Sequence, residues 1–311
     1  MTQYDVITLA DFKSQSDVEG RTIVCGNFIN GATFANQLSQ STFNPLNYTL
    51  EINGSTVNSG NININCGSVA LGPYPSNRYT QIGNSPNQYT IDGHITCNLN
   101  QGNQGAKVQN DSTLPSRCNA ITSSIINLSQ SLSQLPANNN VTIPTSQPGP
   151  LNFNVNNVDA NGVAVFNVSL TSVFSNSNVQ QIQLNQLNYN LKFVVINVYG
   201  TSATWSSGNF VGNWFNTPAT GGSHTIWNFY QATSLTFNNN MRGAVLAPYA
   251  VLTTGSNVDG AVAVKTLYAG GEIHLPVPIF PNCTSPSTST STSQFSTNKM
   301  LDYFMIFSFT I

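Results

Sequence analysis

A short pattern of apolar and polar positions recurs between residues 241 and 274. Each copy has a glycine, an alternating run rich in Ala and Val, and then a turn, and the copies begin at Gly243, Gly260 and Gly271. Strands this short cannot bury a face alone, so the copies must stack on one another roughly 4.8 Å apart. The pattern predicts a β-solenoid, an architecture shared by adhesins, ice-binding proteins, filaments and polysaccharide-cutting enzymes.

Similar strand patterns fill most of the remaining chain. In the first hundred residues, short alternating runs separated by Gly and Asn lie at residues 6–9, 21–24, 48–52, 62–64 and 94–97. From residue 141 to 280 the pattern is again β, with strongly apolar runs at 163–168 and 193–198. The polar segment between these two runs, residues 172–189, is expected to form a strand pair that faces water.

Residues 115–135 follow a different period. Apolar side chains recur there at steps of four, three, four and three, at Ile121, Ile125, Leu128, Leu132 and Leu135. This spacing predicts one α-helix, with Pro115 in its first turn, Ser112 or Thr113 as its cap and Pro136 at its end. Its single apolar stripe indicates a helix that lies along a sheet face. The predicted fold is mainly β, a β-solenoid of the right-handed β-helix type with one long α-helix packed alongside.

Charged residues are scarce in this chain. They make up 6% of the 311 residues, and the formal net charge is -2. A chain without a basic patch is not expected to bind nucleic acid or an anionic membrane surface. Its polar surface must come from Asn, Ser, Thr and Gln, a composition typical of secreted and wall-associated proteins. We therefore expect an extracellular or cell-surface location.

The cysteines and the N-glycosylation acceptors agree with that location. Cys25, Cys66, Cys97 and Cys118 are candidates for one or two disulfides, with reduced thiols buried in a β core as the alternative, and Cys283 is left over. No pair has the CxxC spacing of a zinc site. Candidate glycosylation sites are Asn47, Asn53, Asn110, Asn127, Asn140 and Asn282, whereas Asn167 falls inside an apolar strand pattern and is expected to be unused.

The two ends of the chain differ from its middle. No signal peptide is visible before residues 4–9, which for an extracellular protein favours a start further upstream. The predicted organisation is one domain over residues 1–283, a Ser/Thr-rich stalk at 284–298 and an apolar tail at 299–311. The tail is shorter than the about 20 residues of a membrane span. Its layout matches a lipid-anchor signal, although a mispredicted final exon gives the same pattern, and membrane contact is expected only through such an anchor.

Five phrases in order resemble the choice-of-anchor A domain family. They lie at residues 16–21, 226–229, 243–248, 258–260 and 271–274, and the intervening helix fits the same pattern. The residues that carry the resemblance are Asp17, Glu19, Gly20, Arg21, Trp227, Asp259, Gly260, Glu272 and His274. The family joins one domain, regarded as adhesive, to various C-terminal surface anchors, so the resemblance implies surface display and no defined ligand. The chain departs from the family pattern at Cys25, after Pro248, and where a signal peptide is expected.

The charged residues of these phrases are candidates for chemistry. Asp17, Glu19 and Arg21 alternate along an extended segment and should point the same way, as a general acid/base site requires. The structural alternative, which we favour, is that Arg21 bridges the two carboxylates and orders the turn before the next strand. Glu272 and His274 have the same spacing and could begin a metal site. A hydrogen-bonded pair that caps the last solenoid turn is favoured, because further ligands are missing nearby.

Other motifs of cofactor or catalytic chemistry are missing from the sequence. Asp92 and Asp259 each precede a glycine and a strand, which is typical of a turn that bonds its own backbone. The dense acidic spacing of calcium repeats is absent, and so are a GxSxG nucleophile, a phosphate loop and a dinucleotide fingerprint. We expect no cofactor, no metal and no enzymatic activity.

Three functions remain in agreement with the sequence. The first is a non-enzymatic adhesive or structural module of the cell surface or extracellular matrix, with an unidentified ligand such as a carbohydrate or a matrix protein. The first alternative is an ice- or surface-binding solenoid. Such a face needs a flat ladder of threonines at fixed spacing. The candidate residues are not expected to form one; they are Thr225, Thr233, Thr236, Thr253 and Thr254. The second alternative is a carbohydrate-active β-helix enzyme, with sugar stacked on the aromatic residues between Trp205 and Trp227. Packing inside the solenoid end is the competing explanation for these aromatic residues.

Overall fold

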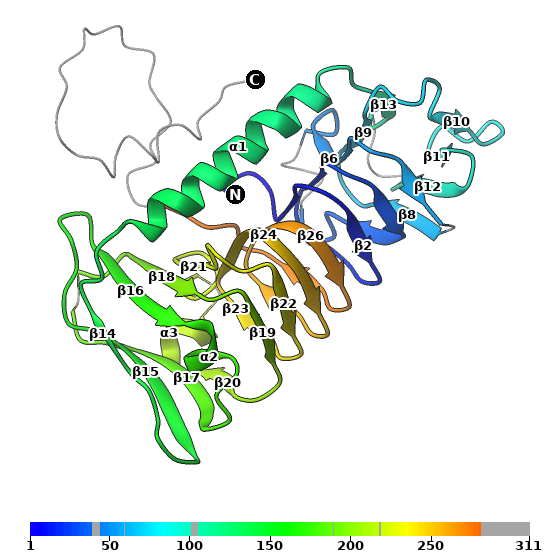
Figure 1. The fold of residues 1–311 in the computed structure, drawn as a ribbon. Helices are drawn as coiled ribbons and strands as arrows, with labels where there is room; N and C mark the ends of the chain where they lie inside the picture. Colours follow the sequence, from blue (N-terminus) through cyan, green and yellow to red (C-terminus); the bar gives the residue numbers. More distant parts are fainter. Residues whose placement is uncertain (39–43, 59, 101–104, 189, 218, 281–311) are drawn as a thin grey trace, which may run out of the picture.

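Parallel β-strands stacked in successive turns form the body of the molecule (Figure 1). The computed structural model describes residues 1–38, 44–58, 60–100, 105–188, 190–217 and 219–280. Within these ranges the strands line up in three faces, and one long helix, α1 (Leu114–Ser133), lies along one of them. The predicted β-solenoid with one helix alongside is confirmed. None of the helices in these ranges is long and apolar enough to cross a membrane.

The face beneath α1, here called the helix face, is one continuous row of parallel strands. Its order is β13–β9–β6–β3–β1–β26–β24–β21–β18–β16. The bounds in that order are β13 (Val108–Asn110), β9 (Ser68–Leu71), β6 (Tyr48–Ile52), β3 (Thr22–Val24), β1 (Val6–Thr8), β26 (Val262–Ala269), β24 (Ala244–Thr254), β21 (Thr225–Asn228), β18 (Phe193–Tyr199) and β16 (Val163–Ser169).

The chain enters the helix face in its middle. β1 pairs in parallel with β3 on one side and with β26 on the other, so Val6 lies between Thr22 and Val262. The turns before α1 run outward from β1 to β13, α1 returns along the face, and the later turns run back from β16 to β26 (Figure 1). The repeated segment at residues 241–274 therefore closes the solenoid against its first turn.

A second face, here called the threonine face, consists of shorter strand segments. Its order is β19–β22–β24–β26–β2–β4–β7, because β24 and β26 continue past the helix face. The additional strands are β19 (Ser202–Trp205), β22 (Ser234–Phe237), β2 (Phe12–Ser14), β4 (Phe28–Asn30) and β7 (Thr56–Val57). The register between β24 and β26 shifts between Ala247 and Val251, where these strands pass from one face to the next.

The third face combines three small sheets. The first has the order β10 (Tyr79–Gln81), β11 (Gln88–Ile91), β12 (Ile95–Leu99), β8 (Gly60–Ile64), β5 (Ala32–Phe34). The second is β23 (Met241–Arg242), β25 (Val258–Asp259), β27 (Ile273–His274), and bridges from Val18 to Phe34 and Ile273 join the two. The third is β14 (Asn140–Thr142), β15 (Gly149–Val155), β17 (Val179–Gln186), β20 (Asn209–Val211).

The polar segment 172–189 differs from the predicted strand pair. It contains the end of a short helix, α2 (Leu170–Val173), and one strand, β17. β17 pairs in parallel with β15 and β20, which belong to neighbouring turns. A parallel partner is reached through a long crossover, so it cannot be an immediate sequence neighbour of β17.

Aromatic side chains fill the interior of the turns that follow α1. Trp205 and Trp227 are fully buried, and the Phe174 ring lies 5.4 and 5.6 Å from their ring centres. Phe210 also contacts both indoles, and Trp214 in the short helix α3 (Gly212–Asn216) is 8% exposed. These rings are core and are closed to a sugar. The alternative in which these aromatic residues stack a sugar is therefore wrong, and the competing explanation, packing inside the solenoid end, is confirmed.

An apolar layer and a disulfide hold α1 to the helix face. Ile125, Leu128 and Leu132 are buried against the outward side chains of the sheet. Cys118 on α1 forms a disulfide with Cys25, which directly follows β3. The helix bounds agree with the predicted 115–135, since the four-three spacing marks the residues that face the sheet.

A row of buried asparagines also connects α1 with the helix face. Asn228 on β21 donates hydrogen bonds to the side chain of Asn197 on β18 and to the Ser129 carbonyl oxygen, both at 2.8 Å. Asn197 donates to the carbonyl oxygen of Leu132 at 2.7 Å. These amides satisfy the polar groups where sheet and helix meet, so the layer excludes water without leaving them unpaired.

A hairpin closes the solenoid end next to β13. β10 and β11 pair antiparallel, unlike the stacked turns, and cover the last turn of the third face. Arg78 beside this hairpin is 1% exposed and its guanidinium lies 2.7 Å from the Asp92 carboxylate. Burial opposes ionisation of Asp92, but hydrogen bonds from Arg78 and Thr56 outweigh it and lower the pKa of that carboxyl. The ion pair fixes the hairpin over an edge that would otherwise be open to strand pairing.

Candidate functional site

The middle of the threonine face carries one aligned row of outward side chains. The parallel register places Thr204, Thr236 and Thr253 directly beside one another on β19, β22 and β24. Thr204 and Thr253 are exposed and Thr236 is half-buried. Neighbouring strands lie about 4.8 Å apart, so the three threonine side chains repeat at this spacing across consecutive turns. The row continues with Tyr268, Lys13, Ile29 and Val57.

A second outward row runs beside the first. It consists of the exposed Ser202 and Ser234 and the half-buried Val251 in direct register, and it ends at the buried Thr266. The positions between the two rows point inward, where Leu235, Leu252 and Leu267 are buried in the core. Stacked parallel turns thus hold hydroxyl and methyl groups in a regular two-dimensional array. Lys13 carries the only charge within these two rows.

The expectation that the threonines form no ladder is wrong for Thr236 and Thr253. Sequence reasoning missed Thr204, which extends their row, whereas Thr225 and Thr254 are buried. The three positions are unequally spaced in sequence because the turn that begins at β19 also contains β20 and α3. A fixed sequence period therefore could not reveal the row. The sequence signal that could have revealed the row is the alternation of Ser or Thr with apolar residues within each of the strands β19, β22 and β24.

The third face carries a compact charged row. Register places Arg242, Asp259 and His274 side by side on β23, β25 and β27. Arg242 forms an ion pair with Asp259, whose other oxygen lies 2.6 Å from His274 Nδ1. His274 Nε2 lies 2.8 Å from Glu272, so the predicted hydrogen-bonded pair is confirmed. The row connects three consecutive turns and includes His274 on β27, the last strand in the described part of the chain.

Both ring nitrogens of His274 face carboxylate oxygens. Burial alone lowers the pKa of an imidazole, but hydrogen bonds to Glu272 and Asp259 and the nearby charge of Glu19 outweigh it and raise the pKa of His274. The imidazolium is the form that can donate from both nitrogens. These side chains hold one another, and their observed role is to connect turns.

Asp17 and Glu19 are occupied with backbone amides. Asp17 accepts a hydrogen bond from the Thr33 amide at 3.3 Å, and Glu19 accepts one from the Leu275 amide at 2.8 Å. The two carboxylates therefore join the first turn of the solenoid to the turns on either side of it. Asp17 also lines an open polar groove between the threonine face and the third face.

Arg21 lies away from these two carboxylates. Its guanidinium lies 3.5 Å from Glu51 and 4.7 Å from the ring centre of Tyr4, on the helix face. The expectation that Arg21 bridges Asp17 and Glu19 is wrong. The chain leaves the third face between Glu19 and Arg21, so alternation along the sequence does not keep the side chains on one surface.

The remaining residues of the family phrases contribute to packing between turns. The Gly20 amide donates to the buried Asp5 carboxylate at 3.0 Å. Gly260 has φ of 141°, and a Cβ there would lie 2.6 Å from the backbone of the preceding turn. Trp227 donates from its indole nitrogen to the Arg242 carbonyl oxygen at 2.8 Å. These packing contacts are sufficient to explain why these residue types occur in the family phrases, and no ligand has to be invoked.

The described cysteines divide into one disulfide and two thiols. Cys25 and Cys118 are bonded, whereas Cys66 and Cys97 are free and buried. One predicted disulfide is thus confirmed, and the alternative of buried thiols holds for the other two cysteines. Burial raises the pKa of Cys97 to about 12, so this thiol stays protonated. Cys283 lies outside the described residues.

The candidate glycosylation sites are distributed over the surface. Five acceptor side chains are exposed, at Asn47, Asn110, Asn127, Asn140 and Asn167. Asn53 is half-buried and its amide donates to the Cys25 carbonyl oxygen at 3.1 Å. Asn282 lies outside the described residues. Use of these sites stays a prediction. In the same described part of the chain, no three His, Cys, Asp or Glu side chains are arranged to hold a metal ion.

A family model covers almost all of the solenoid. The model with the description "Putative Ice-binding-like adhesive domain" matches residues 1–275. The chain belongs to this family. Its ice-binding-like adhesive domain includes α1 and the turns on both sides of it, in agreement with the pairing of β1 and β26. The adhesive character expected from the sequence is thereby supported, while membership of the choice-of-anchor A family stays a prediction.

Three solved ice-binding proteins are similar to this ice-binding-like adhesive domain at low identity. The protein from the Antarctic ascomycete Antarctomyces psychrotrophicus is 10% identical, with 88% of this chain and 95% of that chain covered, at a TM-score of 0.29. The protein from an Antarctic biological consortium is 11% identical, with 89% and 88% covered, at 0.35. LeIBP from an Arctic yeast is 12% identical, with 93% and 95% covered, at 0.34. Scores this low support no residue-level comparison. No curated protein matches the chain.

Proposed function

We propose that this chain is an extracellular surface-binding module that adheres to ice through its threonine face. The observation that carries the proposal is the aligned row of Thr204, Thr236 and Thr253, with a second row of Ser202 and Ser234 beside it. An ice surface is a periodic array of water molecules. A rigid array of hydroxyl and methyl groups can order water in register with such a surface, whereas scattered polar groups cannot.

The other two faces offer less suitable surfaces. On the helix face, α1 and its apolar layer cover the strands beneath it. The third face carries charged side chains, including Arg242 and Glu272, and charged groups order water around themselves instead of in a lattice. The two outward rows of the threonine face are neutral except at Lys13 and are built on strands held in fixed register.

The hydroxyl row is short, which limits the expected activity. It extends over three turns before Tyr268 and Lys13 replace threonine in the same row. We therefore expect attachment to ice with modest thermal hysteresis. Such behaviour suits a module that holds a cell or matrix against a surface, and the family description includes both adhesive and ice-binding-like.

Surface display is the second part of the proposal. The phrases that resemble the choice-of-anchor A family, the Ser/Thr-rich stalk at 284–298 and the apolar tail at 299–311 support presentation of the domain on a cell surface. A carbohydrate-active enzyme has less support, because the aromatic residues expected to stack sugar are buried. The proposed module is non-enzymatic.

Thermal hysteresis of the recombinant domain tests the proposed function. Wild-type protein should separate melting and freezing temperatures, and Thr236→Tyr should remove this effect, because a bulky ring in the middle of the row prevents close approach of ice. Thr80→Tyr is the matched control, since Thr80 is an exposed threonine of β10 on the end hairpin. Both variants should keep the wild-type Tm. The proposal fails if wild type shows no hysteresis, or if Thr236→Tyr retains it in full.

A further inference from the structure

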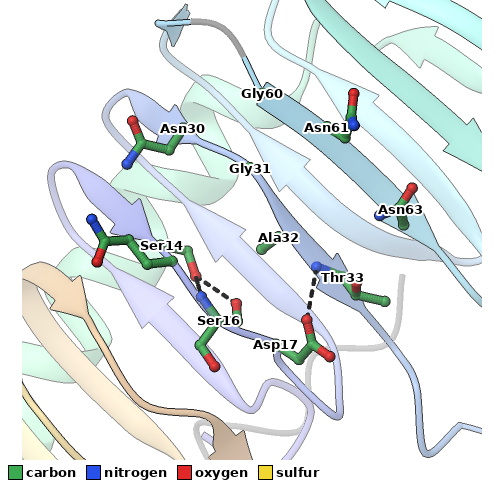
Figure 2. A pocket seen from close by; sticks show the side chains of 11 residues that line it. Ser14, Ser16, Asp17, Asn30, Gly31, Ala32, Thr33, Gly60, Asn61 and Asn63 are labelled. Carbon is green, nitrogen blue, oxygen red and sulfur yellow. Dashed lines mark hydrogen bonds between the residues drawn. The ribbon is translucent and has the colours of Figure 1, made fainter.

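We propose that the polar groove between the threonine face and the third face binds a short stretch of neutral saccharide. The groove has a volume of about 380 Å³ and lies across three consecutive turns (Figure 2). Small-ligand pockets commonly measure roughly 300–1,000 Å³. The site is separate from the threonine row, so it goes beyond the proposed function and does not depend on it.

Glycine residues, which have no side chain, create the groove at one corner of the solenoid. Gly31 and Gly60 lie at this corner on successive turns, and Figure 2 shows the backbone at Gly31 between Asp17 on one side and Asn61 on the other. A Cβ at Gly31 would lie 2.3 Å from the Asn61 carbonyl oxygen, so the close stacking of the turns requires glycine there. Because glycine is required there, the corner has a depression with polar side chains along its two sides.

The side chains along the groove have unused hydrogen-bonding capacity. Among the residues that the structure describes, Asp17 accepts one side-chain hydrogen bond, from the Thr33 amide, through a single carboxylate oxygen. The Asn61 side chain is exposed and has no partner within the described part of the chain. Asn63 accepts a hydrogen bond from Asn98 at 3.0 Å through its carbonyl oxygen, and its amide nitrogen points to the groove in Figure 2.

This set of groups fits sugar hydroxyls better than other small ligands. A hydroxyl both donates and accepts, and planar amide and carboxylate groups can bind two adjacent hydroxyls at once. Asp17 is the one charge among the described lining residues, and its negative charge disfavours an anion. The described part of the lining also has no large apolar side chain, so an apolar ligand would leave its amides unpaired.

The open shape implies weak binding at a single site. Polar groups in an open groove already bind water, and exchange of water for sugar yields little net free energy. Many copies displayed on one surface would raise the overall avidity without new contacts. A groove of this kind therefore suits attachment to a polymer or to a glycan-coated surface.

A glycan array probed with the full chain tests the inference. The array should carry neutral oligosaccharides of glucose, mannose, galactose and N-acetylglucosamine together with sialylated and sulfated glycans. We expect binding to at least one neutral glycan, and titration calorimetry with that glycan should show an affinity lower by about ten-fold or more in Asn61→Tyr, which fills the groove. Asp17→Asn should also weaken binding, since it removes a strong acceptor.

Control variants separate this site from the threonine face. Asn84→Tyr, which places the same ring on an exposed turn of the end hairpin, should bind glycan like wild type. Thr236→Tyr should retain glycan binding, and Asn61→Tyr should retain thermal hysteresis, so each site can fail without the other. The inference is overturned if no neutral glycan binds, if acidic glycans bind in preference, or if Asn61→Tyr binds as tightly as wild type.

Discussion

His274 lies at one end of the charged row that connects the last turns of the solenoid, next to Asp259. Asp259 and Glu272 each lie within hydrogen-bonding distance of one ring nitrogen, and Arg242 neutralises the far oxygen of Asp259. This environment favours the imidazolium and thus raises the pKa of His274. A group whose pKa rises on folding binds its proton more tightly in the native state. The row therefore makes the stability of the domain dependent on pH.

Replacement of His274 by glutamine should remove this dependence. Because the folded-state pKa lies above the ordinary value of about 6.5, the stabilisation is complete below about pH 6.5 and is lost as pH rises through the folded-state pKa. The Tm of wild type should exceed that of His274→Gln at acidic pH, and the difference should shrink with rising pH. His224→Gln, which removes an imidazole at another place, is the control. A difference that is constant or grows with pH would contradict this assignment.

At the scale of single elements, α1 is attached to the solenoid by a covalent link and a polar row. The Cys25–Cys118 disulfide closes a loop with a sequence separation of 93 residues. Asn197 and Asn228 fix the opposite part of the helix through hydrogen bonds to helix carbonyl oxygens. The helix is thus held at both ends of the face that it covers.

Loss of the disulfide should destabilise the domain without changing its fold. A loop of this length constrains the unfolded chain, and we expect the double variant Cys25→Ser/Cys118→Ser to lose roughly 2–4 kcal/mol of unfolding free energy in urea titration. Cys66 and Cys97 remain thiols in both proteins, so a reductant should affect wild type and leave the double variant unchanged. Equal stability of the two proteins would show that the link does not constrain α1.

The helix α1 and its buried side could be predicted from the sequence, whereas the residues that it contacts in the solenoid could not. The four-three spacing of Ile125, Leu128 and Leu132 marks the helix and its buried side because that period is a local property. The pairing of Cys25 with Cys118, in contrast, depends on the turn at which α1 crosses β3. Arg21 shows the same limit, since its partner Glu51 comes from the next turn.

At the scale of the whole molecule, the solenoid is assembled from two halves that meet at β1 and β26. The register of Val6 with Val262 joins segments at opposite ends of the described chain. Sequence patterns gave no indication of this order, because both segments carry the same short alternating pattern. The threonine row was hidden for the same reason: Thr204, Thr236 and Thr253 become neighbours once the turns stack with unequal lengths.

Assembly from two halves predicts a single cooperative unfolding transition. The three tryptophans all lie after α1, so their fluorescence reports on that half, whereas far-UV circular dichroism reports on all strands. Because β1 completes the sheet between β3 and β26, the two signals should change at the same urea concentration. Two separate midpoints would show that the halves fold independently, and would contradict a continuous helix face.

Partition of the protein into slowly growing ice is the sharpest test of ice binding through the threonine face. Wild type should concentrate in the ice fraction, Thr80→Tyr should do the same, and Thr236→Tyr should stay in the liquid with unchanged circular dichroism. Exclusion of wild type from ice, or equal incorporation of wild type and Thr236→Tyr, would show that the threonine face does not bind ice.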